Sequence, residues 1–106
     1  MFARSVSINL KANSTKEFTQ TMENQVIPLL RKQKGFRDEI TLVAPGGLKA
    51  IGISIWDLRE NAEAYNQVAY AEVQKALAKV VEGTPEVQTY EVSNSTFHKN
   101  VAHAGA

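Results

Sequence analysis

The first ten residues alternate between apolar and polar side chains. The apolar ones fall on one face of an extended chain: Phe2, Val6, Ile8 and Leu10. Arg4 is the exception on that face, and the other face holds small or polar residues: Ala3, Ser5, Ser7 and Asn9. Alternation with a period of two is typical of a half-buried strand, so we predict a β-strand over residues 2–10.

After this strand the apolar residues recur at helical spacing: Phe18, Met22, Val26, Leu29 and Leu30. Ser14 and Glu17 have the spacing of a capping box, in which both side chains satisfy free backbone N–H groups at a helix start. Pro28 lies inside the helical pattern and cannot donate a backbone hydrogen bond. We therefore expect a kink or break about one turn before it, and an end of the helix at Gly35.

The pattern predicts two further strands, over residues 37–44 and 48–56, joined by the tight turn Pro45-Gly46-Gly47. A second capping box, Asp57-x-x-Glu60, precedes a second helix. The apolar stripe of that helix consists of Ala62, Tyr65, Ala69, Val73, Ala76 and Val80. We expect Gly83-Thr84-Pro85 to end this helix and residues 86–92 to form a fourth strand.

This order of elements predicts an α+β fold of the ferredoxin-like βαββαβ type. With right-handed crossovers it gives a four-stranded antiparallel sheet with two helices on one face. We expect one domain over residues 1–92. Residues 93–106 show no periodicity and are predicted to form a C-terminal tail.

The two faces of the predicted strands lead to a prediction about assembly. We expect aliphatic side chains on the helix side: Val6, Ile8, Leu10, Ile51, Ile53 and Ile55. The opposite face would then carry small side chains: Ser5, Ser7, Asn9, Ala50, Gly52 and Ser54. A face of small, uncharged side chains permits the close approach of a second sheet. We therefore predict a homodimer whose sheets pack back to back, as a dimeric α/β barrel.

Composition excludes several classes of function. The 106 residues carry 12 basic and 11 acidic side chains, for a net charge of +1, so a nucleic-acid partner is not expected. The local basic cluster Arg31, Lys32, Lys34 and Arg37 lies where the first helix should end, where cations oppose the helix dipole; the alternative is a polyanion site. The absence of cysteine excludes disulfides and thiolate chemistry.

The N-terminal residues lack the apolar run of a signal peptide, and no segment has the length and hydrophobicity of a membrane span. We therefore expect a cytoplasmic protein with no membrane partner. The only histidines, His98 and His103, lie in the predicted tail, and no cluster of ligands has metal spacing, so no metal site is expected.

The chain resembles the antibiotic biosynthesis monooxygenase (ABM) superfamily. The resemblance rests on Pro28, on Lys34-Gly35-Phe36, and on Trp56-Asp57-x-x-Glu60-Asn61-Ala62-x-x-Tyr65, in this order of elements. It implies a dimeric α+β barrel. The superfamily includes cofactor-independent oxygenases of aromatic polyketides, haem-degrading enzymes and members with no known reaction.

Two branches of the superfamily can be compared residue by residue. The haem-degrading branch has asparagine, tryptophan and a histidine ligand where this chain has Val6, Tyr65 and Lys75, so haem degradation is not expected. The polyketide-oxidising branch has an asparagine and an aromatic residue four apart, which Asn61 and Tyr65 match. Tyr70 lies within about one residue of the position of a later tyrosine of that branch, and no arginine is placed to complete the set.

The resemblance implies a cofactor-independent monooxygenase that acts on a small aromatic or quinone-like molecule. Asn61 and Tyr65 would be catalytic, and Trp56, Tyr70 and His98 would bind the substrate. Each has a structural alternative: Tyr65 and Trp56 as core aromatics, Asn61 as a first-turn helix residue, His98 as an exposed tail residue. The alternative function is a non-catalytic domain that binds or senses a small molecule.

Overall fold

The computed structural model of the chain describes residues 1–97. Its elements, in chain order, are β1 (Phe2–Leu10), α1 (Thr15–Thr21), the π-helix η1 (Met22–Val26), α2 (Ile27–Arg31), β2 (Phe36–Val43), β3 (Lys49–Trp56), α3 (Arg59–Val68), α4 (Tyr70–Leu77) and β4 (Val81–Glu91). Because α1, η1 and α2 run on as one helical segment and α3 is followed directly by α4, the predicted βαββαβ order is confirmed.

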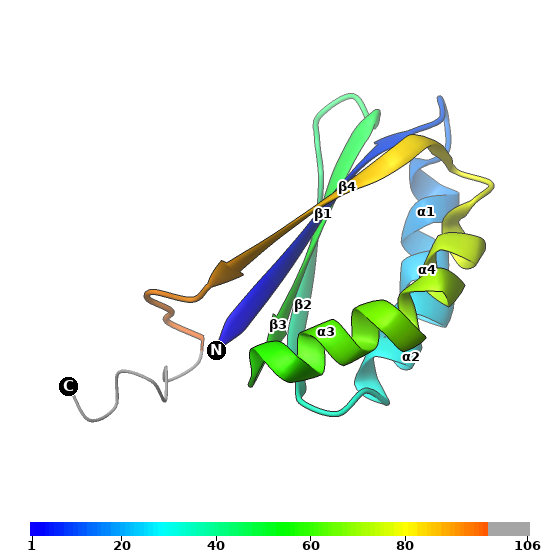
Figure 1. The fold of residues 1–106 in the computed structure, drawn as a ribbon. Coiled ribbons are helices and arrows are strands. Elements are labelled where there is room, and N and C mark those ends of the chain that lie inside the picture. Colours follow the sequence, from blue (N-terminus) through cyan, green and yellow to red (C-terminus); the bar gives the residue numbers. More distant parts are fainter. Residues whose placement is uncertain (98–106) are drawn as a thin grey trace.

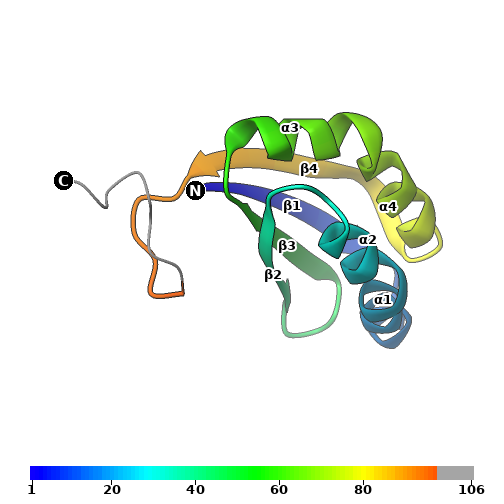
Figure 2. The same cartoon turned by 90° about the horizontal axis from the view of Figure 1, so that it is seen from below.

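The four strands form one sheet in the order β2-β3-β1-β4, and every neighbouring pair is antiparallel. Both helical segments cover the same face of this sheet, which confirms the predicted layers (Figures 1 and 2). We call this covered face the inner face and the opposite one the outer face. None of the helices within residues 1–97 is long and apolar enough to cross a membrane.

The first helical segment is irregular where the sequence predicts it. Residues Met22–Val26 form a π-helix directly before α2, and Pro28 lies in the first turn of α2. Proline lacks the N–H that would bond to the carbonyl four residues earlier, and its ring crowds that carbonyl. A wider turn before Pro28 relieves the crowding, which is the predicted break.

Neither predicted capping box forms. Ser14 is the residue before α1, but no side-chain hydrogen bond caps this helix, and the Ser14 hydroxyl donates to the carbonyl oxygen of Ala12 instead. The residue before α3 is Leu58, not Asp57. The Asp57 carboxylate accepts hydrogen bonds from the backbone N–H of Leu58 and from the Asn61 side chain. The capping prediction was therefore wrong in its hydrogen bonds, although both helices begin within two residues of the predicted sites.

The second helical segment breaks at Ala69, which the sequence did not predict. Ala69 has φ −111° and ψ −21°, and α4 starts directly after it. On an unbroken helix, with about 100° per residue, Tyr65 and Tyr70 would point about 140° apart. The break changes the phase of the helix, and both tyrosines face the space above the sheet.

Gly83-Thr84-Pro85 does not end a helix, because α4 has already ended at Leu77 and all three residues lie inside β4. The β1–β4 register shifts there: Ser7 pairs with Glu86, whereas Asn9 pairs with Glu82. Gly83 has φ +72°. Pro85 has no backbone N–H to donate, but the β1–β4 hydrogen-bond ladder is interrupted at this place, so the missing N–H is tolerated. The tripeptide forms a β-bulge, and β4 is longer than predicted.

The predicted faces of β3 were wrong. Val6 pairs with Gly52 and Ile8 pairs with Ala50, so the small side chains of β3 share the inner face with the apolar ones of β1. Ile51, Ile53 and Ile55 lie on the outer face with Ser5 and Ser7. Alternation defines two faces but does not say which one meets the helices. Trp56 has no exposed surface. It falls on the same face of β3 as the small residues, which is the inner face.

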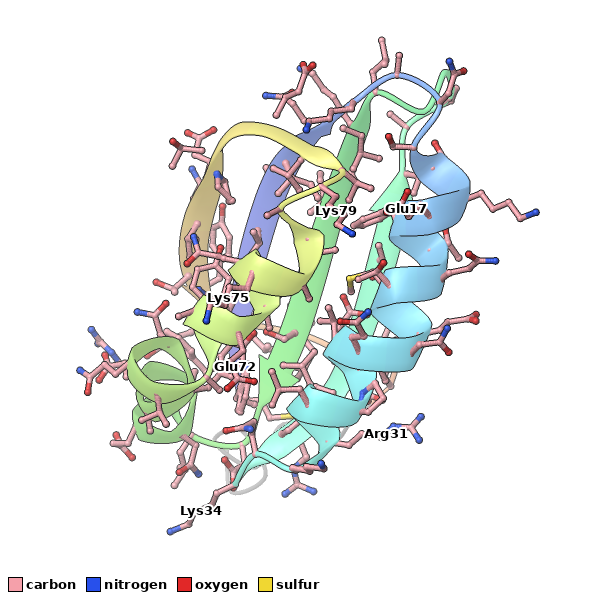
Figure 3. The ribbon with its side chains drawn as sticks, turned by 90° about the vertical axis from the view of Figure 1, so that its right-hand side faces the viewer. Glu17, Arg31, Lys34, Glu72, Lys75 and Lys79 are labelled. Atoms are coloured by element: carbon pink, nitrogen blue, oxygen red, sulfur yellow. The ribbon has the colours of Figure 1, made fainter. Side chains whose placement is uncertain are left out.

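Charged side chains lie on the solvent side of the helices. Figure 3, which views the molecule from this side, labels six of them: Glu17, Arg31, Lys34, Glu72, Lys75 and Lys79. All six are exposed, and both signs occur. Arg31 and Lys34 belong to the basic cluster, which lies where the first helical segment ends, as the helix-dipole interpretation predicts.

Candidate functional site

A cavity of about 310 Å³ lies between the sheet and the two helical segments. This volume is at the lower end of the range for small-molecule sites. Apolar side chains of the helices form most of its wall: Phe18, Met22, Val26, Leu30, Val73 and Leu77. Six polar side chains also line it: Arg4, Glu39, Ser54, Tyr65, Tyr70 and Gln74. The cavity is therefore apolar with a few polar groups.

Arg4 is the most unusual of these groups, because its charge is almost fully buried, with 3% of the residue exposed. Its Nη2 donates a hydrogen bond of 2.7 Å to the Asn66 side-chain oxygen. The guanidinium carbon lies 4.1 Å from the ring centre of Tyr70 and 5.3 Å from that of Tyr65. All these contacts are with neutral groups, although a buried cation normally has an anionic partner. The site is thus suited to an anion.

The two tyrosines belong to a chain of aromatic rings. The ring centres of Tyr65 and Tyr70 are 6.2 Å apart, and Trp56 lies 5.1 Å from Tyr65 and 5.6 Å from Phe36. The indole N–H of Trp56 donates to the Ser54 hydroxyl at 2.9 Å. Trp56 is fully buried and does not line the cavity. Trp56 therefore packs against the Tyr65 ring without reaching the cavity.

Glu39 brings a carboxylate to the cavity from β2. The Thr41 hydroxyl donates to its two oxygens at 3.0 and 2.8 Å. A Cβ atom added at Gly52 would lie 3.2 Å from Glu39 Oε2, so the absence of a side chain at Gly52 leaves room for the carboxylate. Burial raises the pKa of Glu39 above its ordinary value, and the hydrogen bond from Thr41 opposes this shift. Glu39 is therefore a better proton acceptor than an exposed glutamate once it is ionised.

Burial also raises the pKa of Tyr65, to about 12, although the charge of Arg4 acts in the opposite direction. A tyrosine whose pKa rises on folding stabilises the fold below its unfolded pKa, about 10, and this contribution is lost as the pH rises toward 12. Between pH 10 and 12 the free energy of unfolding of the wild type should fall by about 2–3 kcal/mol because of this titration. We predict that this fall is absent in Tyr65→Phe. Urea unfolding at several pH values measures this.

Tyr90→Phe is the matched control, because Tyr90 is 52% exposed on β4. We expect it to keep the wild-type dependence of stability on pH. An equal change in both variants would contradict the assignment to Tyr65.

The structure brings together only some of the predicted site residues. Tyr65 and Tyr70 line the cavity, whereas Asn61 and Trp56 do not. His98 lies outside the described residues, so its predicted role stays a prediction. Sequence reasoning missed Glu39, and it named no arginine for the site although Arg4 lines the cavity. The signal for Arg4 was present, since it is the one charged residue on the apolar face of β1.

Asn61 lies at a junction between β2 and α3. Its Nδ2 donates to Asp57 Oδ1 at 2.8 Å, and the Asp57 backbone N–H donates to the Gly35 carbonyl oxygen at 2.9 Å. The hydrogen bond from Asn61 lowers the pKa of Asp57. These contacts hold the chain before β2 against the start of α3, which is a structural role.

Residues 1–97 contain no group of three or more His, Asp or Glu side chains placed to hold a metal ion. The polar groups of the cavity are one cation, one carboxyl group, one amide group and hydroxyl groups. Such a set can bind an organic anion, accept a proton and stabilise a negative oxygen.

The sequence matches no protein-family model and no curated protein. Solved structures do match. The monooxygenase ActVA-Orf6 of Streptomyces coelicolor, solved with the ligand nanaomycin D, has a TM-score of 0.75 at 14% identity over 92% of each chain. SnoaB, a cofactor-independent oxygenase from Streptomyces nogalater, has a TM-score of 0.72 at 14% identity and covers 90% of this chain and 95% of its own.

A protein of unknown function from Nitrosomonas europaea is similar to the same extent, with a TM-score of 0.73 at 14% identity over 90% of this chain and 91% of that one. Identities of this size establish the fold and leave the activity open. The fold of this chain is that of the antibiotic biosynthesis monooxygenases, which is found in cofactor-independent oxygenases and in proteins of unknown function alike.

Proposed function

We propose that the protein is a cofactor-independent oxygenase that acts on a small, acidic aromatic or quinone-like molecule. The observation that carries the proposal is the buried Arg4 guanidinium, which lines an apolar cavity and contacts the rings of Tyr65 and Tyr70. The ligand of ActVA-Orf6 and the cofactor-independent activity of SnoaB support this choice.

The chemistry requires no electron donor other than the substrate. Anthrone serves as an example: loss of a proton from its methylene carbon gives an anion whose charge is shared with the carbonyl oxygen, and this anion reduces dioxygen. One oxygen atom is retained as a new carbonyl group, and the other leaves as water with the two methylene hydrogens. The protein binds the flat rings against Tyr65 and Tyr70, excludes water, and places Arg4 at the negative oxygen.

Oxygen uptake with anthrone tests the proposal directly. We predict that Arg4→Met lowers kcat/KM about 10²–10³-fold, because a fixed cation at a developing oxyanion is lost. Arg59→Met is the control, since the Arg59 side chain is exposed and pairs with Glu63 on the surface of α3. Equal activity of wild type and Arg4→Met would contradict the proposed site.

Asn61→Ala separates this site from the one that the sequence suggested. Because Asn61 does not line the cavity, we expect normal oxygen uptake and a loss of about 1 kcal/mol in stability from the hydrogen bond to Asp57. If Asn61→Ala loses activity at unchanged stability, the catalytic role predicted for Asn61 stands.

The second candidate is a non-catalytic domain that binds or senses an aromatic anion. It is favoured by the position of Asn61 outside the cavity, because this leaves the resemblance to the polyketide-oxidising enzymes incomplete. Tight binding of anthrone without any oxygen uptake would decide for this function.

We also propose that two copies pair through the outer face of the sheet. Aliphatic side chains of β2 and β3 gather there: Ile40, Leu42, Ile51, Ile53 and Ile55. Ile40 and Leu42 are each 48% exposed, and Ile51 is 38% exposed. A contiguous apolar face of this kind is typical of a protein interface, and sheet-on-sheet packing would cover it. The homodimer therefore remains our proposal, but its interface is formed by isoleucines and not by the small side chains that the sequence analysis predicted.

A further inference from the structure

We propose that Glu39 is the general base that takes the acidic proton of the substrate, opposite Arg4, which holds the substrate oxygen. This inference rests on the proposed function for the class of ligand. It adds a catalytic residue that neither the resemblance nor the sequence pattern indicated.

The register of the sheet brings Glu39 and Arg4 to the same cavity. Ser54 pairs with Glu39 on one side and with Arg4 on the other, so the three residues form one row across β2, β3 and β1. Neighbouring strands lie about 4.8 Å apart, which places the Cα atoms of Glu39 and Arg4 about 10 Å apart. All three side chains line the cavity.

The two charged groups do not neutralise each other. Within residues 1–97 no ion pair joins Arg4 to Glu39, whereas Arg59 and Glu63 form an ion pair on the surface. Arg4 donates to Asn66, and Glu39 accepts from Thr41. A guanidinium and a carboxyl group held apart in one apolar cavity fit a ligand that accepts at one end and donates a proton at the other.

Local structure fixes the carboxyl group. The Thr41 hydroxyl holds both oxygens from two residues further along β2, and Gly52 leaves the space that Oε2 requires. The other titratable or charged groups that line the cavity are Arg4 on β1, Tyr65 on α3 and Tyr70 on α4. Arg4 is a cation and the tyrosines are weak acids, so Glu39 is the carboxylate of this set.

The step is a proton transfer. The Glu39 carboxylate takes a proton from a C–H bond next to, or conjugated with, a carbonyl group. The electron pair of that bond moves into the ring system and onto the carbonyl oxygen beside Arg4. The substrate class is therefore a fused aromatic ketone whose acidic C–H bond and carbonyl oxygen lie on opposite edges. No oxidant is needed until this anion meets dioxygen.

Hydrogen exchange without oxygen tests the base separately from the oxygenation. Anthrone is incubated with the protein in D₂O under argon, and the loss of its methylene proton signal is followed by NMR. We expect the wild-type protein to accelerate this exchange and Glu39→Gln to lower the protein-dependent rate at least about 10²-fold. Glu91→Gln, an exposed glutamate on β4, is expected to exchange at the wild-type rate.

Two further measurements distinguish a base from a structural residue. Anthraquinone has no acidic proton, so Glu39→Gln should bind it with the wild-type Kd; a lost affinity would overturn the assignment. Thr41 is a positioning residue, and Thr41→Val should move the midpoint of the pH–rate profile upward, because the hydroxyl that stabilises the ionised carboxylate is removed.

The outcomes separate the two proposals. If the wild type takes up oxygen with anthrone but Glu39→Gln exchanges as fast as the wild type, the base assignment is overturned and the oxygenase function stands. If the wild type neither exchanges nor consumes anthrone, both are overturned. Exchange that depends on Glu39, together with oxygen uptake, confirms both.

Discussion

Gly35→Ala is expected to destabilise the fold by about 3–5 kcal/mol, a large part of the 5–15 kcal/mol typical of a domain. Gly35 has φ +81°, a conformation that costs an alanine about 1–2 kcal/mol. An added Cβ would also lie 2.8 Å from Asn61 Cβ, and it would overlap Asn61 Nδ2 and Asp57 Oδ1. These atoms belong to the hydrogen-bonded junction at the start of α3, so they cannot move without breaking it. Urea unfolding of the purified variant measures the effect.

Gly83→Ala is the matched control for the backbone contribution. Gly83 has φ +72°, but an added Cβ would meet nothing within 4 Å. We expect a loss of only about 1–2 kcal/mol, from the backbone conformation alone. Equal losses in the two variants would mean that the close contacts with Asp57 and Asn61 contribute nothing.

Much of the fold could be predicted because it depends on local patterns. The alternation over residues 2–10 predicted β1 with its observed bounds, and Pro28 predicted the irregular turn before it. The break at Ala69 could not be predicted in this way. Ala69 is a good helix former, and the break has a tertiary cause, since it lets Tyr70 reach the ring contact with Arg4.

The faces of β3 show a different limit. Strict alternation of large and small residues divides a strand into two faces. The pattern alone does not say which of the two faces meets the helices. Three isoleucines suggested a core, but the side that faces the helices is the one with Ala50, Gly52 and Ser54, and the space above Gly52 and Ser54 is a cavity. Small side chains on a buried face are therefore a sign of a binding site.

The candidate site was half predicted for a related reason. Tyr65 and Tyr70 were among the predicted residues because the resemblance to the ABM superfamily pointed to the second helical segment. Arg4 and Glu39 lie on strands that are separated by β3, and only the register of the sheet places them in one row with Ser54. Arg4 was noted as an exception to a pattern, and that exception was the most direct sign of the site in the sequence.

Ile53→Asp is expected to convert the proposed dimer into a monomer. Ile53 pairs with Ile40 on one side and with Ser5 on the other, so it lies in the middle of the outer face. Dimerisation through this face would bury an unpaired carboxylate from each copy, because a twofold axis repeats the change. We expect the Kd of the dimer to rise about 10³-fold, or about 4 kcal/mol. Light scattering after size exclusion at micromolar concentration measures the mass.

Val68→Asp is the control for this change, since Val68 is an equally apolar residue, 79% exposed, on α3 at the other side of the molecule. The wild type and Val68→Asp should both have twice the mass of the 11.7 kDa chain, and Ile53→Asp should have that of one chain. A monomeric wild type would contradict the homodimer. A dimeric Ile53→Asp would place the interface elsewhere.

The inner cavity is formed within one copy, so Ile53→Asp should still bind anthraquinone. A loss of binding would show that the second copy helps to shape the cavity.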